Sequence, residues 1–367
     1  MNIDRRAFLA ALAAASAGAA LPGRADPLLA ESSLLPSDDL PERLFERTPV
    51  FDALSFIDDE LLTDAGWDLI RRSGVTALHT SLDNRNLRVA LEALAEWQAR
   101  FDSQPNRLVK VLGADDIERT PGEGKLGILL GFQNATCIEG DIDNLSLLHD
   151  AGTRIIQLTY NSRNLLGDGC TERTNAGLSD FGVAVVETMN ELGIAVDLSH
   201  CGEQTSRDGI AISRKPPAFS HTMCKALHDH PRAKSDELLR AMADRSGMIG
   251  IVSLGYFIGP TAETSLEDYL RHIDHAVKVA GIDHVGLASD YSLRGIRATA
   301  TRESWYEPRL KMFKPSYSVR WPPWISELDD PERFRTTAEA LKKRGYRNKE
   351  VEKLLGGNWS RYFRQAL

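Results

Sequence analysis

Two histidines and one aspartate stand at equivalent places in this sequence, each at the end of a short apolar run. His200 ends the run IAVDLSH, His221 ends PAFSH, and Asp290 ends HVGLASD. Imidazole and carboxylate groups are common ligands of zinc and similar divalent ions, and a carboxylate beside such an ion can also move protons. These residue types therefore predict a divalent metal site, with Asp290 as a ligand or a general base.

Each of these residues also has an ordinary structural explanation. A lone buried histidine is most often a hydrogen-bonded core residue, and an aspartate directly after a strand is often a helix N-cap. His200 and His221 are separated by one helical stretch, residues 202–215, so they are expected to end two adjacent parallel strands. Two imidazoles at one rim favour a shared ion over two unrelated core histidines.

The elements that must position these side chains are eight apolar or β-branched segments that alternate with helical stretches. The predicted strands are 50–54, 75–82, 126–134, 154–161, 194–200, 217–221, 248–254 and 284–290. Strands that are apolar on both faces need covering helices, and the pattern predicts an α/β fold, a single (β/α)8 TIM-type barrel. A doubly wound sheet is the alternative, but no G-x-G-x-x-G turn follows the first strand. In a barrel the active site lies at the carboxyl ends of the strands.

Further polar side chains stand at these predicted strand ends. Gln133 ends the third strand, and Tyr160 with Asn161 ends the fourth. Arg232 follows the sixth strand within HDHPRAK (228–234), where its guanidinium can clamp a substrate carboxylate through two hydrogen bonds or belong to a solvated surface loop. We expect Asn161 to contact substrate as well.

The N-terminus predicts export. Arg5 and Arg6 precede an Ala-rich apolar run over residues 7–21, which is typical of a twin-arginine signal over residues 1–25, followed by a linker segment over 26–48 and the barrel over 49–367. The run is too short and too weakly apolar for a spanning helix. We therefore expect a periplasmic protein without a membrane anchor.

The composition excludes some partners but does not decide whether the cysteines form disulfide bonds. The formal net charge of −8 and the absence of Lys/Arg clusters argue against nucleic acid. The four cysteines are too few and too scattered for a disulfide framework, although an oxidising compartment permits one or two bonds. They are Cys137, Cys170, Cys201 and Cys224.

Several blocks carry a family resemblance. AVDLSH (195–200), FSHTMCKALHDHPR (219–232), HIDHAVKVAGIDHVGLASD (272–290) and LKKRGYRNKEVEKLLGGNWSRYF (341–363) resemble, in order and spacing, the membrane (renal) dipeptidase family of zinc hydrolases. The resemblance runs from about Pro49 to the C-terminus. It implies a (β/α)8 barrel with two zinc ions bridged by a carboxylate, acting on dipeptides and related small amides; many members are homodimers.

The resemblance also implies roles for single residues. His200 and His221 match the two histidines that bind one of the zinc ions. Arg232 matches the arginine that holds the substrate carboxylate. Asp290 matches the aspartate that assists proton transfer near the metal.

Four functional positions of the family differ in this chain. Leu54 and Phe56 stand where the first strand has a His-x-Asp pair that binds the other zinc. Gln133 replaces the bridging glutamate, and its neutral amide oxygen is a weak ligand that cannot bridge as an anion. Tyr160 replaces the histidine that steadies the oxyanion. The chain is therefore expected to hold one zinc ion at most, on His200, His221 and Gln133, and to resemble a divergent branch of the family.

Replacement ligands are an open alternative. Asp58 and Asp59 follow the first strand closely, although Asp58 is expected beyond the barrel rim. Cys201 and Cys224 each stand near one of the histidines, but both thiols also suit small core positions.

Three functions fit the sequence. The first is a metal-dependent hydrolase of dipeptides or small peptide-like amides, in which Asp290 moves protons and Tyr160 hydrogen-bonds the oxyanion. The second is a changed reaction on an exported peptide metabolite in the same pocket. The third is a non-catalytic barrel that binds carboxylates or peptides. An aromatic and Pro-rich segment over 301–324 is expected to be a lid or a structural cover for the rim.

Overall fold

The computed structural model describes residues 40–367, and this part of the chain is built around one ring of parallel strands. Eight strands pair side by side in chain order, and every pairing between them is parallel. The strands are β1 (Phe51–Asp52), β3 (Ala77–Ser81), β5 (Leu126–Phe132), β6 (Thr153–Gln157), β7 (Ala195–Asp197), β8 (Ala218–Thr222), β9 (Met248–Val252) and β10 (Val285–Ala288).

Contacts between the first and the last strand close the ring. The Ala53 amide donates to the Leu287 carbonyl over 3.2 Å, and the Asp290 amide donates to the Leu54 carbonyl over 2.8 Å. The predicted (β/α)8 barrel is therefore confirmed.

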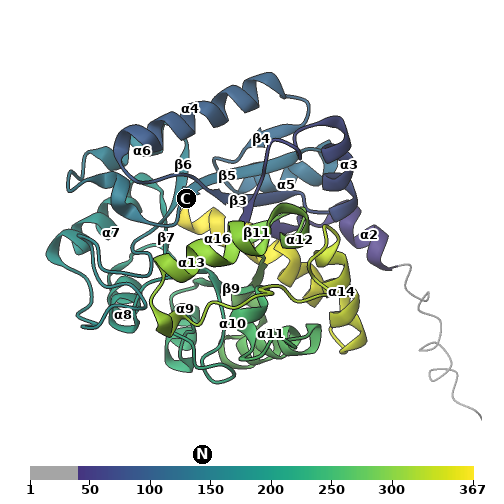
Figure 1. Cartoon of the computed structure of the whole chain (residues 1–367). Helices are drawn as coiled ribbons and strands as arrows, with labels where there is room; N and C mark the ends of the chain where they lie inside the picture. The colour runs from purple at the N-terminus through teal and green to yellow at the C-terminus, as the bar shows by residue number, and fades with distance from the viewer. Residues whose placement is uncertain (1–39) are drawn as a thin grey trace, which may run out of the picture. The chain divides into compact units, whose positions relative to one another are not determined.

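Helices surround the strands (Figure 1). The connecting helices are α3 (Asp64–Ser73), α4 (Leu87–Ser103), α5 (Ala114–Glu123), α6 (Asn144–Asp150), α7 (Asp180–Leu192), α8 (Glu203–Ile212), α9 (Asp236–Asp244), α10 (Gly255–Ile258) and α11 (Leu266–Ala280). Their ends follow from local sequence: Ser179 caps α7 by accepting from the Gly182 amide, and Gly193 ends it in a left-handed conformation at φ 78°.

Three helices end the chain: α14 (Arg333–Lys343), α15 (Asn348–Glu352) and α16 (Asn358–Ala366). Of these, α16 covers the amino ends of the strands. Trp359 and Phe363 of α16 pack against Phe51, with ring centroids 5.8 and 5.3 Å apart. Trp359 also lies where a side chain on Gly286 would stand, so only glycine fits there. Because α16 fills this end, the opposite rim is left for the site.

All eight predicted strands are present, but several end earlier than predicted. The fifth ends at Asp197 rather than at His200, because the Asp197 carboxylate accepts from the Ser199 amide (3.0 Å) and turns the chain out of the ladder. The fourth ends at Gln157, whose side-chain nitrogen Nε2 donates to the Thr159 backbone carbonyl over 2.9 Å. The placement of His200 within a strand was therefore wrong, and the residue lies on the loop beyond it.

Three short strands were not predicted. β4 (Leu108–Lys110) pairs with the first three residues of β5, and β2 (Ser55–Phe56) pairs with β11 (Tyr291–Ser292) above the barrel seam. Strands of two or three residues leave too few positions for a periodic pattern.

The segment 301–324 is ordered and partly helical. It contains α13 (Glu307–Met312), and α12 (Ile296–Thr299) precedes it. Figure 1 shows α13 crossing in front of the strands. Its aromatic residues pack on the rim, with Phe313 centred 4.7 Å from Tyr317.

The predicted linker ends in a helix, α2 (Leu40–Arg47), with Leu44 and Phe45 buried. The predicted export signal over 1–25 lies outside the described residues. Among the helices of residues 40–367, none combines the length and apolarity needed to cross a membrane.

Candidate active site

The structure brings His200 and His221 together at the barrel rim. His200 follows β7, His221 lies in β8, and their Nε2 atoms are 3.0 Å apart. Both side chains are buried. The predicted convergence of two imidazoles from adjacent strands is therefore present.

Hydrogen bonds fix which nitrogen of each ring carries a proton. His200 Nδ1 lies 2.7 Å from Asn161 Oδ1, which only accepts, so His200 Nδ1 donates. Ser220 Oγ donates to Asp197 Oδ2 over 2.5 Å, and it therefore accepts from His221 Nδ1 at 2.8 Å. Both Nε2 atoms are left with lone pairs that face each other.

This arrangement is the ligating form of histidine. Burial lowers the pKa of both imidazoles well below the usual value, and the charge of Arg232 acts in the same direction, so both rings are neutral. Neutral imidazoles oriented through Nδ1 by oxygen atoms are the usual geometry around a bound metal ion. Two facing lone pairs repel each other unless a cation lies between them, so the donor set fits one ion.

Gln133 stands beside this pair. Its side-chain Nε2 atom is 3.3 Å from His221 Nε2, and its backbone carbonyl accepts from Gln157 Nε2 over 2.5 Å. The amide can offer its oxygen to an ion after a half-turn of the terminal torsion. The predicted third donor is therefore within reach of the two histidines.

The two first-strand positions where the family resemblance places ligands of a second ion carry none in this chain. Leu54 is fully buried and Phe56 is half-buried. Asp58 caps the Leu61 amide and forms an ion pair with Arg294 at 3.3 Å. Within residues 40–367 no group of three or more His, Cys, Asp or Glu side chains is arranged to hold a metal ion.

The thiols of Cys201 and Cys224 bond to groups other than the histidine pair, and the Cys170 thiol donates to Asn161 Oδ1 over 3.4 Å. All four are free thiols. Cys201 Sγ accepts from Thr159 Oγ1 over 3.3 Å, and Cys224 Sγ donates to the His272 carbonyl over 3.4 Å. Burial raises the pKa of Cys224 to about 12, which keeps it a thiol rather than a metal-binding thiolate.

Asp290 was predicted to end its strand but lies two residues beyond β10, in a left-handed backbone conformation with φ at 66°. Burial of its carboxyl group raises its pKa to about 7, against the opposing charges of Arg232 and Arg309. A carboxyl group that is half-protonated near neutrality can both accept and donate a proton. Its position and pKa suit the predicted proton transfer.

Two tyrosines stand near Asp290. Tyr160, on the loop after β6, stacks on His200 with ring centroids 4.1 Å apart. Tyr256 of α10 is buried, and the charge of Asp290 adds to the burial that raises the pKa of both phenols. Both remain protonated donors. Tyr256 was missed by the sequence analysis, since it follows a strand by several residues and matches no family position considered there.

Arg232 is completely buried, with 0% of its surface exposed. Its Nη2 donates to the His221 carbonyl over 2.6 Å, and its Nη1 donates to the Ser199 carbonyl. It therefore braces the loop that carries His200 and the strand that carries His221. Its role on a substrate carboxylate, like that of Asn161, stays a prediction.

Arg309 is a second cation at this rim, and the sequence analysis missed it. It lies on α13, donates to the Trp305 carbonyl over 2.8 Å and stacks on the Trp305 ring at 4.0 Å. Among the described residues it forms no ion pair with a carboxylate, and its charge acts on Asp290 and Tyr160. Arg309 comes near Asp290 only through the fold, so its position in the sequence did not indicate a role at the site.

A (β/α)8 barrel with paired histidines at the carboxyl rim defines the class of metallo-dependent hydrolases. The sequence model of the membrane dipeptidases (peptidase family M19) matches residues 70–302, which is more than half of the chain. The chain belongs to the membrane dipeptidase family.

Individual relatives and structures agree with this family. The dipeptidase verJ of Clonostachys rogersoniana is 27% identical over 277 residues, 74% of this chain and 64% of that protein. The dipeptidase tcpJ of Claviceps purpurea is 25% identical over 289 residues, 78% of this chain and 62% of that protein. The chain thus spans less than two thirds of the length of either relative.

Two solved structures share the fold. An amidohydrolase from Pseudomonas aeruginosa superposes with a TM-score of 0.79 at 29% identity, over 89% of this chain and 98% of that chain. A metallo peptidase from Rhodobacter sphaeroides, liganded with a phosphinate mimic of the dipeptide L-Ala-D-Ala, has a TM-score of 0.72 at 20% identity, over 88% of this chain and 100% of that chain. At that identity, the second likeness concerns the fold alone.

Proposed function

We propose that this chain is a metal-dependent hydrolase that cleaves dipeptides or small peptide-like amides, with one zinc ion held by His200 and His221. The observation that carries the proposal is the pair of neutral, buried imidazoles whose Nε2 lone pairs face each other 3.0 Å apart. Membership in the membrane dipeptidase family and the names of the two dipeptidase relatives support the same reaction class.

The residues around this pair have distinct roles in the proposed reaction. When bound there, the ion supplies Lewis acidity to the amide carbonyl and to water. Asp290, with a pKa of about 7, accepts a proton from the attacking water and returns it to the leaving amine. Tyr160 keeps its proton because burial raises its pKa, so it donates a hydrogen bond to the developing oxyanion.

The charges at the rim favour a substrate that carries a carboxylate. The positive charges of Arg232 and Arg309 both act on the single carboxyl group of Asp290. An anionic substrate group restores the balance of charge there. We propose that Arg232 and Arg309 together orient this group.

We also propose that the protein acts in the periplasm. The support is the sequence pattern of Arg5 and Arg6 before an apolar run, which is typical of twin-arginine export. Fractionation of a strain that makes the full chain, with Arg5→Lys/Arg6→Lys as the control, tests this location.

The experiment for the proposed function measures metal content per chain together with hydrolysis of a dipeptide panel. Parent, His200→Ala and His149→Ala proteins are compared, because His149 is a histidine on α6 outside the site. We expect one equivalent of zinc and measurable hydrolysis in the parent and in His149→Ala, and loss of both in His200→Ala. Hydrolysis that survives in His200→Ala, or a parent that neither holds metal nor cleaves any dipeptide, contradicts the proposal.

A further inference from the structure

A pocket adjoins the candidate active site at Tyr160 and Asn161. Its volume is about 550 Å³, within the range of small-molecule sites. Three rim segments form it: the loop after β5 (134–140), the loop after β6 (160–171) and the end of α13 with its following residues (312–314). None of the residues assigned above to the ion lines it.

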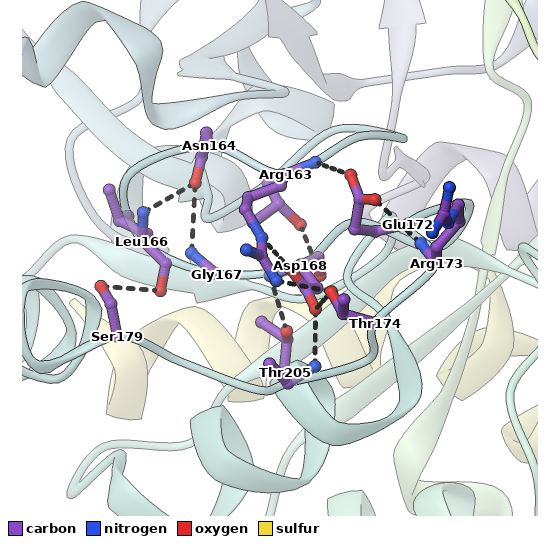
Figure 2. A network of polar contacts seen from close by, with 12 residues as sticks. Arg163, Asn164, Leu166, Gly167, Asp168, Glu172, Arg173, Thr174, Ser179 and Thr205 are labelled. Atoms are coloured by element: carbon purple, nitrogen blue, oxygen red, sulfur yellow. Dashed lines mark hydrogen bonds and ion pairs between the residues drawn. The ribbon is translucent and has the colours of Figure 1, made fainter.

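The loop after β6 is held in place by a buried carboxylate. Asp168 is 1% exposed and accepts from Arg163 Nε (2.5 Å) and Thr174 Oγ1 (2.9 Å). Figure 2 shows Arg163 and Thr174 turned toward Asp168, with Thr205 beneath them. Because this network fixes the loop from within, the pocket wall is preformed.

The pocket is continuous with the candidate active site through two shared residues. Tyr160 lines the pocket and stacks on His200, and Asn161 lines the pocket and orients His200 through Nδ1. Phe313, on the facing wall, lies 6.2 Å from Tyr160 between ring centroids. Tyr160 and Asn161 therefore join the wall of this pocket to the histidine pair.

The mouth of the pocket exposes large apolar side chains. Six such side chains are strongly exposed in residues 40–367, and two of them line this pocket: Leu165 at 62% and Met312 at 72%. Inside, Leu166, Phe313 and Tyr160 continue the apolar lining. Exposed apolar side chains at the mouth of a concave site mark ligand contact.

We propose that this pocket binds the apolar acyl or side-chain group of an amide substrate whose scissile amide lies at His200 and His221. The inference rests on the proposed function and narrows it: the substrates are amino acids or dipeptides that carry a large apolar group, such as N-acyl amino acids. Lys314, whose Nζ donates to the Thr171 carbonyl over 2.6 Å, adds a polar edge to the same pocket.

The test uses two probes that differ only in chain length, N-octanoylglycine and N-acetylglycine. Binding is measured by isothermal titration calorimetry on the full chain carrying Asp290→Asn, so that the probe is not hydrolysed. Asparagine is chosen because it tolerates the left-handed backbone conformation of position 290. Since each buried methylene favours binding, N-octanoylglycine is expected to bind roughly tenfold tighter or more.

Two matched substitutions then locate the effect. Met312→Glu and Leu310→Glu each place a charge on an exposed residue of α13, but only Met312 lines the pocket. We expect Met312→Glu to remove most of the difference between the probes and Leu310→Glu to leave it unchanged. Leu165→Asp and Leu147→Asp form a second such pair, with Leu147 on α6 outside the pocket.

The outcomes separate this inference from the proposed function. Equal affinity for both probes, or equal effects of Met312→Glu and Leu310→Glu, overturns the inference even in an enzyme that cleaves dipeptides. A chain-length preference that Met312→Glu abolishes supports the inference even if the protein with native Asp290 cleaves neither probe nor any dipeptide. In that case only the proposed hydrolysis fails.

Discussion

The same hydrogen-bonding arrangement occurs twice at the barrel rim: an aspartate at the end of a strand accepts from nearby backbone amides and serine hydroxyls. We call it a bracket. One bracket lies beside the histidine pair, and the other lies at the seam between β1 and β10. At the end of β7, Asp197 accepts from the amide and hydroxyl of Ser199 and of Ser220. At the end of β1, Asp52 accepts from the amide of Leu54 and from the amide and hydroxyl of Ser289.

The residues that follow these brackets differ. His221 comes directly after Ser220, and its ring is oriented by the same hydroxyl group that bonds Asp197. Asp290 comes directly after Ser289, but the Ser289 hydroxyl, which donates to Asp52, otherwise lies near the carbonyls of Leu54 (3.1 Å) and Tyr291 (3.2 Å). The bracket is therefore a way of shaping a strand end, and metal chemistry depends on which side chains it presents.

The strongest test of this difference truncates one residue at the histidine pair and one residue at the seam. His221→Ala removes a proposed ligand, so we expect loss of the metal and a fall in kcat/KM on the order of 10³-fold. Leu54→Ala removes buried apolar surface at the seam, so we expect a lower melting temperature with unchanged metal content per folded chain. Metal analysis and thermal unfolding of both proteins check this. Retention of zinc by His221→Ala would break the comparison.

Metal-ligating side chains introduced at the seam are expected to create a second metal site there, so that the seam binds an ion as the histidine pair does. Leu54→His, Phe56→Asp and Gln133→Glu together restore the donors that the family resemblance places at these positions. We expect metal content to rise from one to two equivalents per chain, because two nitrogen or oxygen donors and an anionic bridge suit a second zinc ion. The double variant Leu54→His/Phe56→Asp, which lacks the anionic bridge, is the control. A count that stays at one would show that the seam backbone, rather than its side chains, excludes the second ion.

The sequence was sufficient for the barrel and for the histidine pair, because both depend on local patterns. Apolar runs bounded by helices predicted all eight barrel strands, and the ends of two of these runs carried His200 and His221. The tautomers could not be predicted, since the bond from Asn161 to His200 joins residues 39 positions apart through a loop. Arg309 was missed for a similar reason: it reaches the rim only because 301–324 folds back over the barrel.

The seam carboxylate is expected to make stability depend on pH. Burial raises the pKa of Asp52 from 3.8 to about 6, so the folded protein binds a proton more tightly than the unfolded chain. Stability from this group is fully present below about pH 4 and is lost as pH rises through 6, a change of about 3 kcal/mol.

Asp52→Asn isolates this contribution. The buried His230 and His272, whose pKa values are lowered by burial to about 3 and 4, act in the opposite direction and stabilise the protein as pH rises toward 6.5. The difference in unfolding free energy between parent and Asp52→Asn cancels these histidines. We expect this difference to shift in favour of Asp52→Asn between pH 4 and pH 7 in denaturant titrations; a flat difference would mean that Asp52 is ionised throughout.

The two bracket serines provide the finest comparison, because the same atom is removed from each side. Ser220→Ala deletes the hydroxyl that orients His221 through Nδ1, and loss of such an outer partner typically weakens metal binding by about 10- to 100-fold. Ser289→Ala deletes the hydroxyl on Asp52 Oδ2 and leaves a buried carboxylate oxygen without that donor, which costs about 1–3 kcal/mol of stability. Competition with a zinc chelator should therefore separate the two proteins, with weakened metal binding only in Ser220→Ala. Equal metal affinity in both variants would show that Asp197 and Ser220 only shape the strand end, as Asp52 and Ser289 do.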